Sequence, residues 1–566
     1  MDERLVVMEQ DEAQVTALAD EADVPLIVAR VLINRGITTA EQYLDFINPS
    51  TDALHDPFLL PDMEIAAGRL AKAVKEKEHI CVHGDYDADG VTSTAILVRM
   101  LRALEANVRY HLPHRKRGGY DLKTATVEEL EGLGVTLIVT CDCGISASEA
   151  IGRASELGID VIVTDHHEPG EALPAAYAVV NPKRVDSNYP FRELAGVGVA
   201  YKLAQGVVRL LDANEESFKS RFMDLVAFGT IADVAPLVGE NRIFVKQGLL
   251  DIPKTKKLGL QTLLRATNII QKPVGVYHVG FVLAPRINAV GRMDDAAKAL
   301  DLLLTADEKE AGELMSEIEI HNSNRKIVQQ NIMQDAIEQM QSKDLSSTHV
   351  LVLAAEGWNT GVVGLAAGRI AEEYSRPAIL LSIDPESGMA TGSGRSVPAF
   401  HLLDGVRHCA DHLTRSGGHA AAVGLTLPAS GIAAFEECIN GYAASLASID
   451  DFIPKITLDA EIDASDLTVS LAQSVATLEP FGAGNAEPLF LSRNLSVVSK
   501  QRVGDGSHFK MQIKGKNTNP IDCIGFGLGD YDDIVELGGE IDLCYNIRLN
   551  TFNGASTLQL SIQEIL

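Results

Sequence analysis

The chain has 566 residues, with 49 Lys or Arg against 78 Asp or Glu, so its formal net charge at pH 7 is −29. This charge excludes a general nucleic-acid coat, because the average field of the protein repels polyanions. A hydrophobic content of 46% excludes a disordered chain, and the length predicts about three or four domains. Any polyanionic substrate therefore has to meet a local basic patch or bound metal ions.

No targeting or membrane segment is expected. No apolar run reaches the ~18 residues that a membrane span needs. The N-terminal stretch MDERLVVMEQDEAQ carries acids where a signal peptide has a basic region followed by an apolar one. We therefore expect a cytoplasmic protein that has no membrane partner.

The cysteines predict reduced thiols. They are odd in number, scattered, and contain no Cys-x-x-Cys pair, which favours buried free thiols over a disulfide framework or a zinc site. The seven positions are Cys81, Cys141, Cys143, Cys409, Cys438, Cys523 and Cys544.

The first 60 residues predict a small, mainly helical preface. From residue 79 onward, short β-rich runs alternate with helical stretches that begin at Ser or Thr caps. Winding of this strand–helix–strand kind predicts a parallel sheet with its chemistry at the carboxyl ends of the strands. The expected strands are residues 79–83, 107–111, 136–141, 160–164 and 176–180.

Residues 306–340 contain no proline and only one glycine, which predicts one or two long helices that connect domains. A second α/β unit follows, with expected strands at 349–355 and 377–383. From about Lys455 onward, short strands and turns predict a small β-barrel. Roughly five or six such strands suit an OB-like barrel, although periodicity alone does not exclude another barrel type.

The predicted fold class is therefore α/β, in five parts. These are the helical preface (1–60), the parallel-sheet domain (61–300), the connecting helix (301–345), a second, smaller α/β domain (346–447) and the OB-like barrel (448–566).

Carboxylates and imidazoles follow three of the expected strands. So many acids at one sheet edge repel one another unless cations neutralise them, and a mixed carboxylate and imidazole set suits Mn²⁺ or Mg²⁺ better than calcium or a thiolate zinc site. Two such ions about 3.5 to 4 Å apart are a common device for attack on phosphorus. For any one Asp the alternative is a helix cap or turn residue. The residues are His83, Asp85, Asp87 and Asp89 after the first strand, Asp142 after the third, and Asp165, His166 and His167 after the fourth.

These motifs resemble the DHH phosphoesterase superfamily. Residues 83–93, Asp142 and residues 165–167 are similar to its first three motifs, and Asp233 within residues 229–236 matches a fourth. The later Gly-Gly-His at 417–419 is similar to the DHH-associated (DHHA1) domain. Within the superfamily, the preface, the long connector, the barrel and the segments 285–293 and 480–485 resemble the bacterial RecJ family of single-strand exonucleases. The likeness covers nearly the whole chain.

The resemblance implies a role for each residue of the site. Asp142 and Asp233 are the candidates to contact both ions or the second one, while Asp85 and Asp165 would hold the ligands in place. His167 would bind metal, contact the scissile phosphate or orient its neighbour. His419 would donate to the phosphate or the leaving group, unless it is an ordinary loop histidine. The implied metal ligands are His83, Asp87, Asp89, Asp142, His166 and Asp233, and the implied catalytic residues are Asp142, His166, His167 and His419.

A second implied set would hold the substrate. Arginine suits a 5′-terminal phosphate because its planar fork makes two parallel contacts, and an aromatic ring can stack on a base, which is worth about 1 to 3 kcal/mol. For each arginine a surface salt bridge is the alternative, and the barrel lysines are as well explained as solvated edge residues. Asp121 stands where the family has glycine, which leaves the conformation of that loop open. The implied residues are Arg115, Tyr120, Arg286, Ser393, Gly394 and Arg395.

The resemblance implies a metal-dependent 5′→3′ exonuclease that releases mononucleotides from single-stranded DNA in repair and recombination. The alternative is a DHH phosphodiesterase that acts on oligoribonucleotides or cyclic dinucleotides, although the smaller enzymes of that kind lack the preface and barrel. A non-enzymatic scaffold would be expected to have lost ligands. The implied partners are single-stranded DNA, a single-strand binding protein and a RecQ-type helicase. The physiological metal, the oligomeric state and tolerance of RNA stay open.

Overall fold

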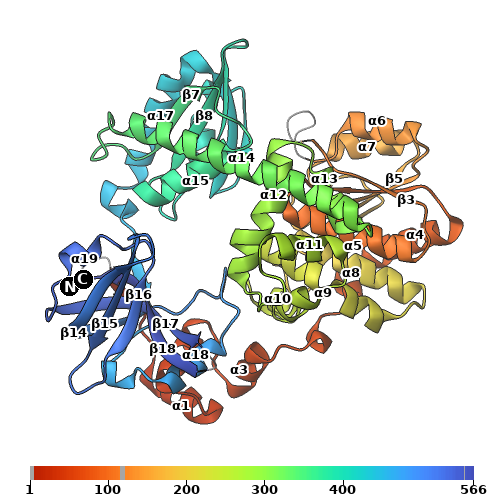
Figure 1. The fold of residues 1–566 in the computed structure, drawn as a ribbon. Helices are drawn as coiled ribbons and strands as arrows, with labels where there is room; N and C mark the ends of the chain where they lie inside the picture. Colours follow the sequence, from red (N-terminus) through yellow and green to blue (C-terminus); the bar gives the residue numbers. More distant parts are fainter. Residues whose placement is uncertain (1–4, 115–120, 553–554) are drawn as a thin grey trace. The chain divides into compact units, whose positions relative to one another are not determined.

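The computed structural model describes residues 5–114, 121–552 and 555–566 (Figure 1). The chain forms two compact units. The larger unit comprises Asp56–Asp233 and Gly248–Pro454, and the smaller comprises Met1–His55, Val234–Gln247 and Lys455–Leu566.

The larger unit begins with a five-stranded sheet of order β3-β2-β4-β5-β6 in which every pairing is parallel. β2 and β4 are buried along their whole length, as expected for strands covered on both faces. The carboxyl ends of the strands meet at one edge, as the sequence predicts. The strands are β2 (Ile80–Gly84), β3 (Val108–His111), β4 (Leu137–Cys141), β5 (Asp160–Thr164) and β6 (Ala178–Val180).

Helices cover this sheet. One core cluster joins residues of the sheet to α6 and α7, while α8 packs on α4 and α5, and all three of these helices also contact strands of the sheet (Figure 1). The helices are α4 (Met63–Glu76), α5 (Ala88–Ala103), α6 (Thr124–Gly132), α7 (Ser148–Glu156) and α8 (Gly196–Leu210).

A helical segment continues the larger unit and ends in one long helix. That helix, α14 (Glu308–Met340), has 33 residues, is capped by the Asp307 side chain and packs on α11, α12, α13 and α15. The predicted connector is therefore a single helix. The preceding helices of this unit are α9 (Glu215–Ala232), α11 (Leu258–Ala266), the π-helix His278–Leu283, α12 (Ala284–Met293) and α13 (Ala297–Leu304). The helix α10 (Gly239–Asp251) begins in the smaller unit and ends in the larger one.

The second sheet of the larger unit has the order β10-β11-β9-β8-β7, and only β7 and β8 pair in parallel. The glycine-containing strand β9 lies against β8, where a Cβ on Gly392 would lie 1.9 Å from the Leu380 carbonyl oxygen. The elements are β7 (Leu351–Glu356), α15 (Val363–Tyr374), β8 (Ala378–Asp384), β9 (Met389–Arg395), α16 (Leu402–His408), β10 (Arg415–Gly418), β11 (Ala422–Pro428) and α17 (Ile432–Leu446).

Cys409 and Cys438 form a disulfide, so the prediction that all seven thiols are reduced is wrong for this pair. Cys409 follows α16 and Cys438 lies on α17, and these helices pack together. The Cα atoms are 6.1 Å apart, within the usual range for a disulfide. The two cysteines lie 29 residues apart in the sequence, and this spacing matches no motif that would have predicted their pairing. The other five cysteines are buried and are not in disulfides.

The smaller unit contains a closed five-stranded barrel of order β14-β15-β16-β18-β17, closed by the pairing of β14 with β17. This confirms the predicted OB-like barrel. β13 (Ala460–Glu461) pairs with β14 at its edge. The barrel strands are β14 (Phe490–Val503), β15 (His508–Lys514), β16 (Ile521–Gly525), β17 (Glu540–Phe552) and β18 (Ala555–Ile565).

The N-terminal helices share one hydrophobic core with the barrel. β1 (Leu5–Val7) also pairs in parallel with β12 (Ile456–Leu458). The five-part division of the chain stays a prediction. Among the described residues, no helix combines the length and apolar character required to cross a bilayer. The helices are α1 (Glu12–Ala22), α2 (Leu26–Asn34), α3 (Ala40–Ile47) and α18 (Val469–Ala476).

Candidate active site

Acids and imidazoles gather where β2, β4 and β5 end. Their potential ligand atoms form three groups, within each of which all atoms lie within 4.8 Å of one another. His166 and Asp142 each belong to two groups and so join them into one cluster, which we call the acidic cluster. The groups are Asp142, His166 and His167; Asp89, His166 and Asp233; and Asp85, Asp87 and Asp142.

Asp87 and Asp89 are fixed by backbone amides. Asp87 caps α5, and its Oδ1 accepts from the amides of Asp89 and Gly90 at 3.0 and 3.1 Å. Asp89 is 1% exposed, and its two oxygens accept from the amides of Gly196 and Val197 at 2.8 and 2.7 Å. Asp87 therefore has both roles that the sequence offers for it: it caps a helix, and it belongs to the acidic cluster.

His166 lies at the centre of the acidic cluster. Its Nε2 is 3.1 Å from Asp142 Oδ1 and 4.0 Å from Asp89 Oδ2, and its Nδ1 is 3.9 Å from Asp233 Oδ2. Asp233 reaches the cluster from the C-terminal cap of α9. Burial lowers the pKa of His166, although Asp89 opposes this effect. A neutral imidazole is the form that binds a metal ion.

The carboxylates of the acidic cluster repel one another. Burial, followed by the charge of Asp233, raises the pKa of Asp89 to about 7. Burial, followed by the charge of Asp87, raises the pKa of Asp233 to about 7. Burial and the neighbouring Asp89, Asp87 and Asp85 raise the pKa of Asp142 well above its usual range.

Divalent cations would relieve this repulsion, so the residues present fit such ions. The donor set consists of carboxylate oxygens and imidazole nitrogens, with no cysteine among the groups found in the described residues. This set matches Mn²⁺ or Mg²⁺.

Asp165 holds His167 in place. The Asp165 side chain is fully buried, and its Oδ1 lies 2.7 Å from His167 Nδ1 while accepting from the amides of His166 and His167. Burial opposes ionisation of Asp165, but the hydrogen bond from His167 prevails and lowers its pKa. Burial likewise opposes the charged form of His167, but the Asp165 bond prevails and raises its pKa to about 9. His167 is therefore a half-exposed cation beside the carboxylates.

His83 is not a member of the three ligand groups, and its Nε2 is buried without a hydrogen-bond partner among the described residues. Its Nδ1 lies 3.0 Å from His111 Nδ1, and the two rings stack with centroids 5.0 Å apart. Burial and the neighbouring His111 lower the pKa of His83 to about 3. His83 and His111 are register partners on the neighbouring parallel strands β2 and β3, which brings their rings together. Asp85, which the sequence suggested as a supporting residue, lies in a ligand group instead.

Comparisons with known proteins match this architecture. Family models match for the DHH family N-terminal domain over residues 79–230, the DHHA1 domain over 347–445 and the RecJ OB domain over 458–564. The single-stranded-DNA-specific exonuclease RecJ of Bacillus subtilis is 37% identical over 562 residues, which cover 99% of this chain and 70% of that protein. RecJ of Escherichia coli K12 is 33% identical over 566 residues, which cover 96% of each. The chain belongs to the RecJ family.

A solved RecJ structure shares the fold. The crystal structure of RecJ from Thermus thermophilus in complex with Mn²⁺ matches with a TM-score of 0.85 and 31% identity, covering 100% of this chain and 80% of that one. The corresponding Mg²⁺ complex matches with a TM-score of 0.79 and 29% identity, covering 100% of this chain and 79% of that one. The predicted α/β fold with DHH, DHHA1 and OB-like parts is therefore confirmed.

Part of the implied substrate set lies outside the described residues, namely Arg115 and Tyr120. Asp121, the next residue, is described. It has φ 74°, in the left-handed region that favours glycine and that Asp also enters. The backbone thus keeps a glycine-like conformation where the RecJ pattern has glycine. The carboxylate is buried, which raises its pKa, and it accepts from the Leu122 amide at 2.9 Å.

Two other implied residues, Arg286 and Arg395, line one pocket of about 540 Å³. Arg395 donates to Ser393 Oγ and to the Gly394 carbonyl, both at 2.8 Å. Arg286 is paired with Glu319 at 2.6 Å, so the salt-bridge alternative holds for it even though it lines the pocket. Further cations line the same pocket, which we call the arginine pocket: Arg325, Lys326 and Arg369.

Sequence reasoning missed these further cations because they lie on the helices α14 and α15, where a charged residue looks like any solvated helix face. Arg325 stands out in the structure, since its Nε is buried without a hydrogen-bond partner among the described residues. Gly364, on α15, allows a close approach: a Cβ there would lie 3.1 Å from Ser393 Oγ and 3.2 Å from Arg395 Nη2.

His419 follows β10 and is exposed. Its Nδ1 accepts from the Ala421 amide at 3.3 Å, so the neutral ring carries its proton on Nε2. Partial burial of the ring, followed by the positive charges of Arg395 and His167, lowers its pKa. The pKa of His419 is therefore affected by one residue of the arginine pocket, Arg395, and by one residue of the acidic cluster, His167.

Proposed function

We propose that this RecJ-family chain is a metal-dependent exonuclease that hydrolyses single-stranded DNA from its 5′ end and releases 5′-mononucleotides. The observation that carries the proposal is the acidic cluster, formed by buried carboxylates and His166 at one sheet edge. It occurs in a chain whose relatives in Bacillus subtilis and Escherichia coli are named single-stranded-DNA-specific exonucleases.

Five residues of the acidic cluster would hold two divalent cations, Mn²⁺ or Mg²⁺. The Thermus relative was solved with each of these ions. When bound, such ions supply a nucleophile from water at neutral pH and offset charge on the phosphoryl oxygens. Asp142, shared by two groups, is the candidate to contact both ions. The proposed ligands are Asp87, Asp89, Asp142, His166 and Asp233, with Asp85 close enough to assist.

Two histidines would act on the scissile phosphate. His167 is held by Asp165 and positively charged at neutral pH, so its ring can donate to a non-bridging oxygen. His419 can donate from Nε2 while neutral, because its Nδ1 is occupied by the Ala421 amide. We propose that it donates to the phosphate or to the leaving oxygen.

The arginine pocket would bind the 5′-terminal phosphate and so set the polarity. Arg395 is oriented by Ser393 and Gly394, and its guanidinium can make a bidentate contact with a phosphate. Arg286 and the half-buried Arg325 add positive charge to the same pocket. In a chain with a net charge of −29, such a local concentration is what a polyanionic substrate requires.

The substrate suggests the cellular setting. We propose a cytoplasmic role in DNA repair and recombination, with a single-strand binding protein and a RecQ-type helicase as partners that supply unwound strands. A phosphodiesterase for oligoribonucleotides or cyclic dinucleotides is not favoured, because the chain carries the RecJ OB domain and a closed barrel.

A time course on DNA labelled at either end tests the proposal. The expected result is metal-dependent release of mononucleotides from the 5′ end of single strands, with no release from a blunt duplex or in chelator. Turnover of short oligoribonucleotides or cyclic dinucleotides, without cleavage of DNA, would keep the metal site and contradict the proposed substrate.

A further inference from the structure

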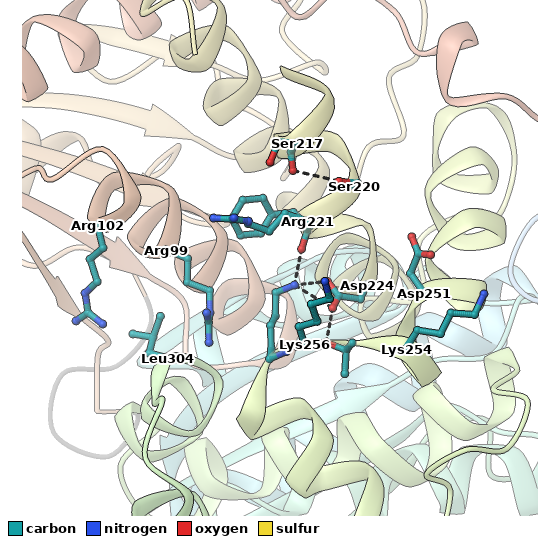
Figure 2. Close-up of a pocket in the computed structure, with 13 residues that line it drawn as sticks. Arg99, Arg102, Ser217, Ser220, Arg221, Asp224, Asp251, Lys254, Lys256 and Leu304 are labelled. Atoms are coloured by element: carbon teal, nitrogen blue, oxygen red, sulfur yellow. Dashed lines mark hydrogen bonds and ion pairs between the residues drawn. The ribbon is translucent and has the colours of Figure 1, made fainter. Parts of the chain in front are cut away.

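A second basic pocket lies in the larger unit, on α5, α9 and the segment between α10 and α11 (Figure 2). Its volume is about 630 Å³, a size typical of small-molecule sites. Figure 2 shows Arg99 and Arg102 on one side and Lys254 on the other. We call it the helix pocket, and its cations are Arg99, Arg102, Arg221, Lys254, Lys256 and Lys257.

The carboxylates of the helix pocket do not balance these six cations. Asp224 and Asp251 are the two acids in the lining. Asp224 is already engaged within the wall, because it pairs with Lys257 Nζ at 2.7 Å and accepts from Thr255 Oγ1 at 2.6 Å. The lining therefore carries a net positive charge in a chain that is otherwise strongly acidic.

The remaining cations of the helix pocket lie among like charges. Arg99 Nε donates to the neutral Leu303 carbonyl at 2.9 Å. Burial lowers the pKa of Arg99, and the charges of Arg102 and Arg221 lower it further, against the opposing effect of Asp224. Within the parts of the chain that the structure describes, Arg221, Lys254 and Lys256 are exposed and form no ion pair. Gathering like charges costs free energy that a bound anion would recover.

The helix pocket is separate from the site described above. Counting 1.5 Å per helical residue, it lies roughly 15 Å from Asp89 along α5 and roughly 18 Å from Asp233 along α9. None of its cations lines the arginine pocket. The hydroxyl groups of Ser217 and Ser220 add hydrogen-bonding capacity at its rim.

We propose that the helix pocket binds a ligand with clustered phosphates, supplied either by a free nucleoside triphosphate or by the backbone of a DNA strand. Arginine forks and lysine point charges are the usual partners of phosphate oxygens. The concave pocket suits a few phosphates rather than a flat contact with a duplex. Because α5 and α9 also carry Asp89 and Asp233, the ligand would contact two helices that position the acidic cluster.

The test is calorimetric titration of the full chain at low salt in chelator, so that no cation in the acidic cluster can hold phosphate. The probes are adenosine triphosphate and a 5′-hydroxyl thymidine oligonucleotide. The variant is Arg221→Ala/Lys254→Ala, whose side chains are exposed and whose loss should leave the fold intact. Lys72→Ala/Lys75→Ala removes the same charge from α4, and Arg286→Ala/Arg395→Ala disables the arginine pocket.

We expect the wild type and the Lys72→Ala/Lys75→Ala control to bind equally, and Arg221→Ala/Lys254→Ala to bind about tenfold more weakly or worse. A loss confined to adenosine triphosphate identifies a nucleotide site, and a loss confined to the oligonucleotide identifies a strand contact. Equal affinity of wild type and Arg221→Ala/Lys254→Ala for both probes would overturn the proposal. So would binding that only Arg286→Ala/Arg395→Ala abolishes, since the phosphate would then sit in the arginine pocket.

Discussion

Replacing Asp142 by Asn separates the effect of the acidic cluster on folding stability from its role in metal binding and cleavage. Asp142 is 2% exposed and has φ 60°, a conformation that Asn adopts as readily as Asp, so the change removes charge without adding backbone strain. The Asp142 carboxylate is repelled by Asp89, Asp87 and Asp85. In chelator, the variant should therefore unfold at the same temperature as the wild type or higher.

With Mn²⁺ present, we expect the order of unfolding temperatures to reverse, so that the wild type is the more stable protein. An ion present at 100 times its dissociation constant stabilises the folded state by about 2.7 kcal/mol, and each tenfold loss of affinity removes about 1.4 kcal/mol of that gain. Because Asp142 is shared by two ligand groups, Asp142→Asn should gain much less from Mn²⁺ than the wild type. Since loss of a supporting residue alone costs about 10–100-fold, loss of this ligand should lower cleavage by about 100-fold or more.

The assay is thermal unfolding of both proteins in chelator and in a Mn²⁺ series, followed by cleavage of single-stranded DNA. The control is Asp212→Asn, which removes the same charge from an exposed loop. Asp224→Asn is not used, because Asp224 forms an ion pair with Lys257. Equal Mn²⁺ stabilisation of Asp142→Asn and wild type would refute the reasoning. A large drop in unfolding temperature in chelator would show instead that Asp142 stabilises the fold.

Three further predictions follow from named contacts. Asp165→Asn removes the anchor of His167 and should lower kcat about 10–100-fold with a smaller effect on KM; an effect on KM alone would place His167 away from the reacting phosphate. Arg395→Ala should weaken use of 5′-phosphorylated strands about tenfold or more relative to 5′-hydroxyl strands, and an equal loss on both would argue against the arginine pocket as the 5′ site. Gly364→Ala should produce the same preference change in weaker form, because its Cβ would crowd Ser393 and Arg395; unchanged preference would mean that these side chains shift freely.

The acidic cluster could be predicted from the sequence because several of its members directly follow strands that the sequence pattern indicates. Asp87, Asp142 and His166 each lie within three residues of the end of a strand. Parallel pairing then brings strand ends to one edge whatever the details of packing. His83 differs from these residues: it lies inside β2 and contacts His111, and its part in metal binding stays a prediction. His111 ends β3, so the same strand-end rule could have drawn attention to it.

Contacts between distant parts of the chain were not predictable. Arg325 and Arg369 come together because α14 packs on α15, and nothing in either helix marks them as different from solvated charges. The disulfide between Cys409 and Cys438 likewise depends on the packing of α16 against α17. The N-terminal helices and the barrel lie more than 400 residues apart in sequence but share one core.

The most direct test of the account is the position of Mn²⁺ in crystals of this protein, measured by anomalous diffraction. The account predicts two peaks within the acidic cluster, contacted by Asp87, Asp89, Asp142, His166 and Asp233, with one or both lost in Asp142→Asn. Active crystals with no peak at the cluster, or with ions held elsewhere, would contradict it.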